Sequence, residues 1–294
     1  MFGSHSLVFS GFWLGVFMCK RTTSKTALAV ALGAFAFTAA ASAQGVRSQD
    51  VPDWNGFYVG GYVGSAWSDA NIRTDAGTYV PGSSYFTSTA NIDSINQNGS
   101  GSVNPDAFTG GVQIGANLKS GNWVFGLEAD FGSFSLKGTR GATNFVYPSL
   151  PANTYTMHAS IDADWLLTAR ARLGWAIQPN MLIYVTGGLA MTNLRVSNSF
   201  SDDADSAGVG GGSHSQTMRG WTIGGGAELA LSRAWSIKAE YLYVDFGSLT
   251  VRSSVGCGPA ATFDCSSVPV LPNAFSTSAD LSAHIARVGL NYKF

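Results

Sequence analysis

This chain has few charged residues and few cysteines, and it has no excess of basic residues. Only 12% of its 294 residues are charged, whereas about a quarter are charged in a typical soluble domain. The 17 basic residues do not outnumber the 18 acidic ones, which argues against nucleic acid as a partner. Three cysteines are too few for a disulfide scaffold in a chain of this length.

Signatures of catalysis and metal binding are also missing from the sequence. It contains no H-E-x-x-H zinc motif, no G-x-S-x-G nucleophile elbow and no Walker-type phosphate loop. His158, His214 and His284 lie in different segments, without a spacing that predicts a metal site. The acidic segment Asp202–Asp205 has too few oxygen ligands for Ca²⁺ and is expected to be solvated. We therefore expect neither an enzyme nor a bound cofactor.

Glycine and aromatic residues, by contrast, are abundant. The chain has 36 Gly, 18 Phe, 10 Tyr and 8 Trp, far too many buriable side chains for a disordered protein. Beyond residue 43 no apolar run reaches the length of about 20 residues that a transmembrane helix needs. We therefore expect the apolar surface to be carried by β-strands.

The N-terminal region has the pattern of an export signal. Residues 18–43 contain basic residues, then an apolar stretch, then the sequence Ala41-Ser42-Ala43, which matches a signal-peptide cleavage site. We expect residues 1–17 to be an upstream segment from a mis-assigned start codon. The mature chain would then begin with a short periplasmic segment, 44–53, and continue as one barrel domain, 54–294.

Eight segments of the barrel region alternate apolar and polar residues with a period of two, which no helix fits. In the clearest of them, every second residue from Ile161 to Trp175 is apolar, and Arg170 and Arg172 lie in the other phase. Aromatic residues occupy the apolar phase and charges the polar phase, as expected of strands that face lipid outside and a polar lumen inside. The predicted strands are 57–67, 108–118, 123–132, 161–176, 181–195, 218–229, 235–244 and 283–294.

The connections between these segments are of two kinds. Three are tight turns, near residues 120, 179 and 232, which we place on the periplasmic side. The other four are long, rich in Gly, Ser, Asn and Thr, and expected to be mobile extracellular loops: 68–107, 136–160, 196–216 and 248–281. The predicted fold is thus all-β, an eight-stranded antiparallel transmembrane β-barrel with short periplasmic turns and long extracellular loops.

Three motifs resemble the small eight-stranded outer-membrane barrels of alphaproteobacteria, which are related to OmpA-like and opacity-protein barrels. They are WNGFYVGG at 54–61, WSIKAEYLYVDFG at 235–247 and RVGLNYKF at 287–294. The resemblance implies a surface-exposed protein of the bacterial outer membrane, in contact with its lipid. It also implies that the barrel-assembly machinery recognises the alternating C-terminal residues, although an ordinary amphipathic last strand would have the same pattern: Val288, Leu290, Tyr292 and Phe294.

The inward phase of the predicted strands contains four acidic and four basic residues. Because an unpaired charge inside a narrow barrel is costly, we expect these residues to pair and to plug the lumen. The alternative is that they line a narrow ion path. The residues are Glu128, Asp130, Arg170, Arg172, Glu228, Lys238, Glu240 and Arg287.

Cys257 and Cys265 lie eight positions apart in the last long connection. In an exported protein we expect them to form a disulfide, with two free thiols as the alternative.

The function that these patterns predict is non-enzymatic. We expect an integral outer-membrane barrel that contributes to envelope integrity and binds surface ligands, of unknown identity, through its loops. The alternative is a narrow porin-like channel for small solutes.

Overall fold

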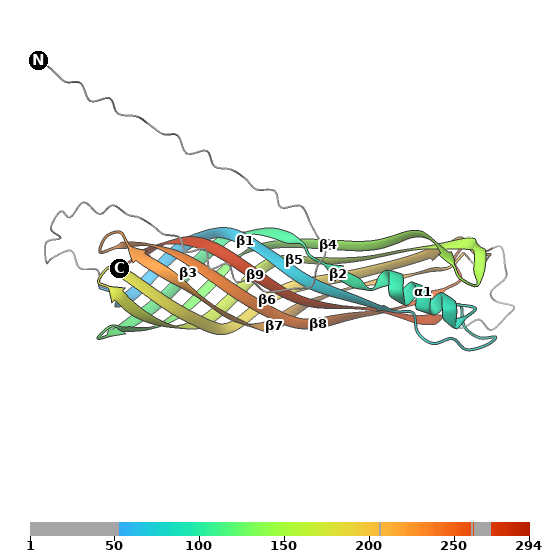
Figure 1. The fold of residues 1–294 in the computed structure, drawn as a ribbon, viewed down its shortest axis with the longest axis horizontal. Coiled ribbons are helices and arrows are strands. Elements are labelled where there is room, and N and C mark those ends of the chain that lie inside the picture. The colour runs from blue at the N-terminus through green and yellow to red at the C-terminus, as the bar shows by residue number, and fades with distance from the viewer. Residues whose placement is uncertain (1–52, 206, 260, 262–271) are drawn as a thin grey trace, which may run out of the picture. The chain divides into compact units, whose positions relative to one another are not determined.

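The computed structural model describes residues 53–205, 207–259, 261 and 272–294 (Figure 1). The predictions for residues 1–17, for the signal peptide 18–43 and for residues 44–52 lie outside this range. The elements are β1 Gly56–Asp75, α1 Thr89–Gly99, β2 Gly101–Val103, β3 Asp106–Ser120, β4 Trp123–Tyr147, β5 Leu150–Gln178, β6 Met181–Asp202, β7 Val209–Ala230, β8 Trp235–Gly256 and β9 Asn273–Lys293.

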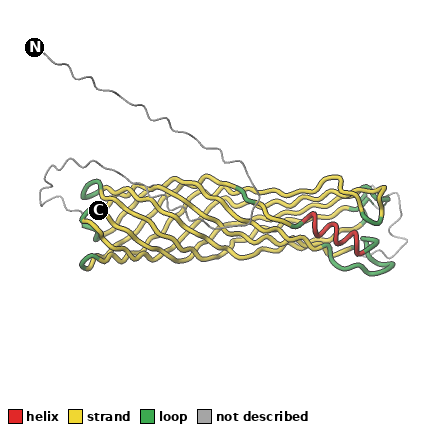
Figure 2. Tube along the Cα trace, viewed as in Figure 1, coloured by secondary structure: helices red, strands yellow, loops and turns green. Residues whose placement is uncertain are grey.

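Eight long strands close into an antiparallel barrel, which confirms the predicted fold. Each of them pairs with its neighbour in the chain, and β1 also pairs with β9, from Tyr58 opposite Lys293 to Asp75 opposite Ser276. The three-residue β2 pairs with β1 beyond the end of β3. Short turns and the C-terminus lie at one end of the barrel, and α1 lies at the other (Figures 1 and 2). Within the described ranges, no helix is long and apolar enough to cross a membrane.

The strands are much longer than predicted, so the prediction of four long mobile loops was wrong in its extent. β4 has 25 residues and β5 has 29, whereas about 9–11 residues cross a bilayer. Most of the predicted loop 136–160 is a hairpin in which only Pro148 and Ser149 lie outside the strands. The described residues of the other predicted loops likewise belong largely to strands and to α1.

The strands continue because the alternation persists with its polarity reversed. On β4, outward residues change from Phe131 to Ser135 and Lys137, while inward residues change from Asp130 to Leu136. The half of the barrel away from the short turns is therefore built like a soluble protein, with an apolar core inside. That core includes Ala66, Phe134, Leu136, Ile161, Leu166, Leu194, Val196, Leu242, Val244, Phe246, Leu281 and Ile285.

A β-bulge on β5 corrects one detail of the predicted pattern. Ile161 and Ala163 were expected to face outward, but both are fully buried inside the barrel. The register of β5 on β6 shifts between Ala163 and Leu166, which places the intervening Asp164 outside. A bulge adds one residue and so reverses the faces of the residues beyond it, a change that an unbroken period of two cannot predict.

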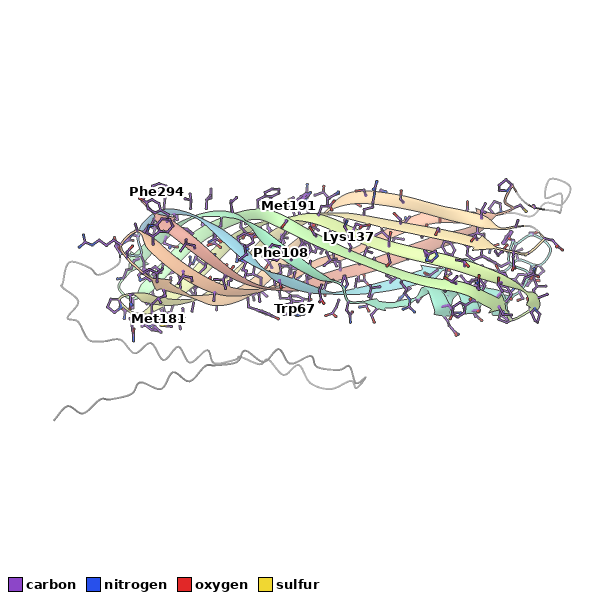
Figure 3. The ribbon with its side chains drawn as sticks, turned by 90° about the horizontal axis from the view of Figure 1, so that it is seen from above. Trp67, Phe108, Lys137, Met181, Met191 and Phe294 are labelled. Atoms are coloured by element: carbon purple, nitrogen blue, oxygen red, sulfur yellow. The ribbon has the colours of Figure 1, made fainter. Side chains whose placement is uncertain are left out.

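The outward apolar residues form a belt around the half of the barrel that ends in short turns. Trp175 and Trp165 bound this belt on β5. They are ten positions apart, a separation that spans about 25 Å at the usual rise and tilt of barrel strands. That height matches the apolar band of an outer-membrane barrel. Phe294 and Met181 lie near one end in Figure 3, and Trp67, Phe108 and Met191 lie farther along. Aromatic residues mark both edges of the belt. The edge nearer the short turns has Trp123, Trp175, Trp235 and Tyr292, and the other edge has Trp67, Phe108, Trp165 and Trp221.

Candidate functional site

All eight charged residues predicted for the lumen lie together inside the barrel, at the level of the apolar belt. Each is at most 5% exposed. Strand pairing places opposite charges directly across from each other: Glu128 opposite Arg170, Glu228 opposite Lys238, and Glu240 opposite Arg287. Directly opposed side chains are in contact range, and two of these pairs, Glu128 with Arg170 and Glu240 with Arg287, form ion pairs in the network.

Arg170 is the centre of the network. Its guanidinium lies 2.5 Å from Glu128, 2.8 Å from Asp130 and 3.0 Å from Glu240. One cation thus makes short contacts with three carboxylates, which come from two strands, β4 and β8.

The remaining cations complete the pairing. Arg172 lies 2.7 Å from Glu228, and Lys238 lies 2.8 Å from Glu128. Arg287 contacts Glu240 and lies 3.0 Å from Asp130. Each of the four carboxylates thus has at least one cation within 3 Å, and the formal charges of the eight residues sum to zero.

Tyrosine and threonine side chains supply contacts that our sequence analysis missed. Tyr58 donates to Glu128 at 2.6 Å, Tyr184 donates to Glu240 at 3.0 Å, and Thr168 donates to Asp130 at 2.6 Å. The guanidinium of Arg287 stacks over the ring of Tyr62 at 4.3 Å. All four residues lie in the inward phase of their strands, and that signal could have identified them.

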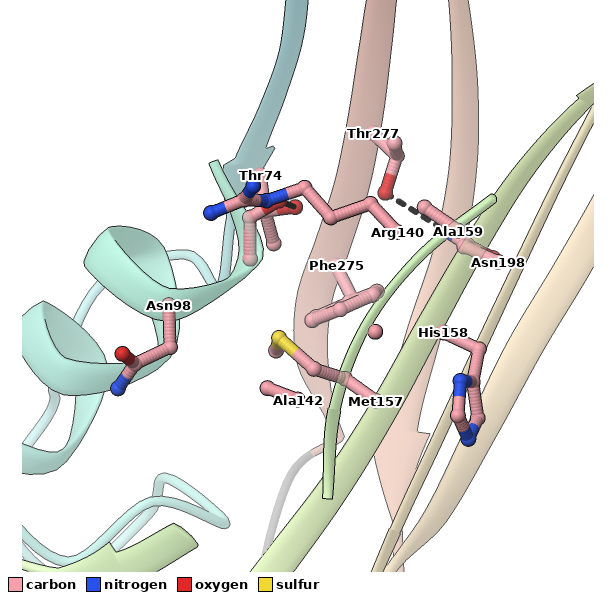
Figure 4. A pocket seen from close by; sticks show the side chains of 12 residues that line it. Thr74, Asn98, Arg140, Ala142, Met157, His158, Ala159, Asn198, Phe275 and Thr277 are labelled. Carbon is pink, nitrogen blue, oxygen red and sulfur yellow. Dashed lines mark hydrogen bonds between the residues drawn. The ribbon is translucent and has the colours of Figure 1, made fainter. Parts of the chain in front are cut away.

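The lumen is filled on the side of the network away from the short turns. The apolar core occupies the barrel above the network, and α1 packs over that core at the end of the barrel. Apolar side chains of α1, Ile92 and Ile95, join a second buried cluster with Phe86, Tyr155 and Phe275. A cavity of about 10 Å³ remains beneath α1, between residues such as Arg140 and Met157 (Figure 4). It holds at most about one water molecule.

Asp202 fastens the segment that carries α1, so the expectation of a purely solvated acidic segment was wrong for this residue. Its carboxylate accepts hydrogen bonds from Tyr85 and Tyr147, both at 2.8 Å, and from the backbone N–H of Gly208 at 2.7 Å. Burial and the neighbouring carboxylate raise the pKa of Tyr147 well above its usual value, so its hydroxyl remains a donor. Asp202 thereby joins three extracellular connections.

We expect Asp202→Asn to loosen this end of the barrel. The amide presents a donor where Asp202 offers only acceptors, and losing a buried hydrogen-bond partner costs about 1–3 kcal/mol. Hydrogen exchange of α1 should therefore become faster. Asp93→Asn, an exposed substitution on α1 itself, is the matched control. Equal exchange in the two variants would contradict this role of Asp202.

The other end of the lumen is closed by Trp54. Its ring is 5% exposed and packs with Val124, Leu182 and Tyr184. Its indole N–H donates to the carbonyl of Pro179 at 3.2 Å. A cavity of about 20 Å³ lies beside it, room for one or two water molecules. Buried side chains therefore occupy the described barrel at three levels: around Trp54, in the charge network and in the apolar core above it.

Comparison with known families identifies this architecture. Residues 27–294 match the model of the outer membrane protein beta-barrel domain. The chain belongs to this family. It is accordingly an outer-membrane protein, and the short-turn end of the barrel faces the periplasm.

Individual relatives agree with the family. The chain is 32% identical over 249 residues to the 31 kDa outer-membrane immunogenic protein of Brucella melitensis, covering 83% of this chain and 85% of that protein. It is 25% identical to the 22 kDa outer membrane protein of Rhizobium leguminosarum, over 66% of this chain and 65% of that protein. Among solved structures, OprG from Pseudomonas aeruginosa aligns with a TM-score of 0.41 and 12% identity, over 83% of this chain and 98% of OprG.

The last strand of this outer-membrane barrel carries the predicted assembly residues on its outer face. Val288, Leu290, Tyr292 and Phe294 are all exposed, and the residues between them point inward or toward the rim. They are therefore accessible from outside the barrel, and their recognition by the assembly machinery stays a prediction. Cys257 is disulfide-bonded, whereas its predicted partner, Cys265, lies outside the described residues.

His158, His214 and His284 lie within strands, whereas the predicted bounds place the first two in loops and His284 at the start of a strand. His158 is on β5, His214 on β7 and His284 within β9. Across the described part of the chain, no three His, Cys, Asp or Glu residues gather as a metal site. His284, however, lies among aromatic residues of the outer wall. The Tyr241 hydroxyl lies 2.6 Å from the Nδ1 of His284, and the Trp67 ring stacks on the imidazole with 6.0 Å between the ring centroids. Sequence spacing could not predict this patch, because its residues come from opposite ends of the chain.

Proposed function

We propose that this protein is a closed structural barrel of the outer membrane that carries a stiff β-sheet extension into the extracellular space. The observation that carries the proposal is the filled lumen: a paired charge network at membrane depth, an apolar core above it and Trp54 below it. An eight-stranded barrel has an interior just wide enough for side chains. A filled interior supports a role in envelope integrity and surface display over a role in solute flow.

The extracellular extension supports a role in surface interactions. Many of its outward residues are small and polar; one row across four strands consists of Thr139, Ser160, Ser197 and Ser213. Strand pairing along β4, β5 and β6, with a few register shifts, orders this surface, so a partner loses little of its binding energy in ordering it. The Brucella relative is named as an immunogenic protein of the outer membrane, which suits a barrel that displays such a surface.

Single-channel recording tests the proposal against the narrow-pore alternative. The protein, purified from outer membranes and shown to be folded by its heat-modifiable gel mobility, is inserted into a planar bilayer. We expect no openings above the baseline, while a general porin inserted under the same conditions conducts. Steady openings whose conductance scales with salt would overturn the proposal and assign an ion path to the charge network.

A further inference from the structure

The outer wall carries an aromatic patch where the apolar belt meets the polar extension. Its rings come from β1, β8 and β9, and from β7 at one edge. His284 lies in its centre, 6.0 Å from Trp67, 6.0 Å from Tyr241 and 5.1 Å from Tyr243. Trp221 continues the patch at 5.4 Å from Tyr243. We call these five residues the His284 patch.

The patch is polar as well as aromatic. Tyr241 hydrogen-bonds His284 at 2.6 Å, and the Asp69 carboxylate lies 3.9 Å from the other ring nitrogen of His284. The Tyr243 hydroxyl donates to the carboxylate of Asp245 at 3.4 Å. Two carboxylates thus border the rings, and the Asp69 side chain is 59% exposed.

The depth of the patch selects its ligand. On β1 the outward residues change from Val63 and Trp67 to Asp69, and on β8 they change from Tyr241 to Asp245 at the same boundary. A group in contact with the patch therefore lies at the headgroup level of the outer leaflet. Aromatic faces beside carboxylates are the chemistry that recognises organic ammonium groups.

We propose that the His284 patch binds the positively charged amine of a membrane-lipid headgroup. The ammonium would lie against Trp67 and Tyr241, both about half-exposed, between the carboxylates of Asp69 and Asp245. Arg219 faces outward on β7, two positions from Trp221. Its positive charge would repel an ammonium group at that edge of the patch, so the Trp67 side is the more favourable place for the amine. This site does not depend on whether the lumen conducts.

Lipid association measured by electron spin resonance tests the proposal. The purified protein is reconstituted with spin-labelled phosphatidylcholine or phosphatidylglycerol, which share a phosphate and differ in the amine. We expect the choline lipid to associate about threefold more strongly, the size of an exposed cation–π contact. The combined change Asp69→Asn and Asp245→Asn, and separately Trp67→Leu, should reduce this preference to about one.

Matched controls separate the patch from the aromatic belt in general. Trp165→Leu removes an outward tryptophan at the same boundary on β5 and should keep the wild-type preference. Asp69→Asn alone changes an exposed side chain, so it should fold normally and still lower the preference. Equal association of both lipids with the wild type, or an unchanged preference in the Asp69 and Trp67 variants, would overturn the proposal. An amine-free glycolipid that associates as strongly as the choline lipid would also overturn it and point to sugar stacking.

Discussion

Replacing Arg170 with methionine is expected to destabilise the barrel by about 3–5 kcal/mol, the cost of breaking a buried ion pair from one side. The substitution removes the cation that lies within 3.0 Å of Glu128, Asp130 and Glu240. Other cations contact these carboxylates, but the inner charge changes from zero to −1 in a medium that solvates it poorly. Guanidinium unfolding of the protein in lipid vesicles measures the loss.

The control for this experiment is Arg195→Met, which removes an exposed, outward-facing arginine from β6. Its effect should be within about 0.5 kcal/mol of the wild type, as for most surface substitutions. A second variant, Arg170→Met with Glu240→Gln, restores a balanced set of three cations and three anions and should recover part of the stability. An Arg170 variant as stable as the Arg195 control would show that the network does not stabilise the barrel.

Replacing Leu127 with lysine should cost about 2–4 kcal/mol, the penalty for a cation at the bilayer midplane on the lipid face of a barrel. Leu127 is 68% exposed and lies midway along the apolar belt on β4. Its side chain would have to leave hydrocarbon or draw water and headgroups inward. The free energy of unfolding in vesicles provides the measurement.

Ser135→Lys provides a matched comparison on the same strand and the same outer face. Eight residues farther along β4, Ser135 lies above the belt, so a lysine there should be nearly neutral, like the natural Lys137 beside it. Together the two variants locate the membrane boundary. A similar penalty at both positions would mean that lipid covers the extension, and no penalty at Leu127 would remove the basis for the assigned belt.

The charge network was predictable because each step needs only the period of a strand. Glu128 and Arg170 lie in the inward phase of segments whose outward phase is aromatic, and eight strands leave no room for an empty lumen. Their partners Tyr58 and Tyr184 follow the same rule. Distances and the central position of Arg170 were not predictable, because they depend on strand register and shear.

The extension beyond the membrane was missed for a different reason. The pattern that predicts a lipid-facing strand has apolar residues facing outward, whereas above the belt many outward residues are serines, threonines and charges. An inward Leu136 next to an outward Lys137 has the same period of two with opposite polarity. The bulge near Asp164 also shifts the phase within one continuous strand.

Eight barrel strands, the face of each that meets lipid within the belt, and the eight inner charges could all be inferred from the amino-acid sequence alone. Alternation and charge balance are local properties, so they can be seen one segment at a time. The length of the strands, the contacts of Asp202 with the segment that carries α1, and the meeting of Trp67 with Tyr241 and His284 could be seen only in the three-dimensional fold. The last of these depends on closure of β1 against β9, which brings residues about 200 positions apart to one level of the wall because the ladder fixes their register.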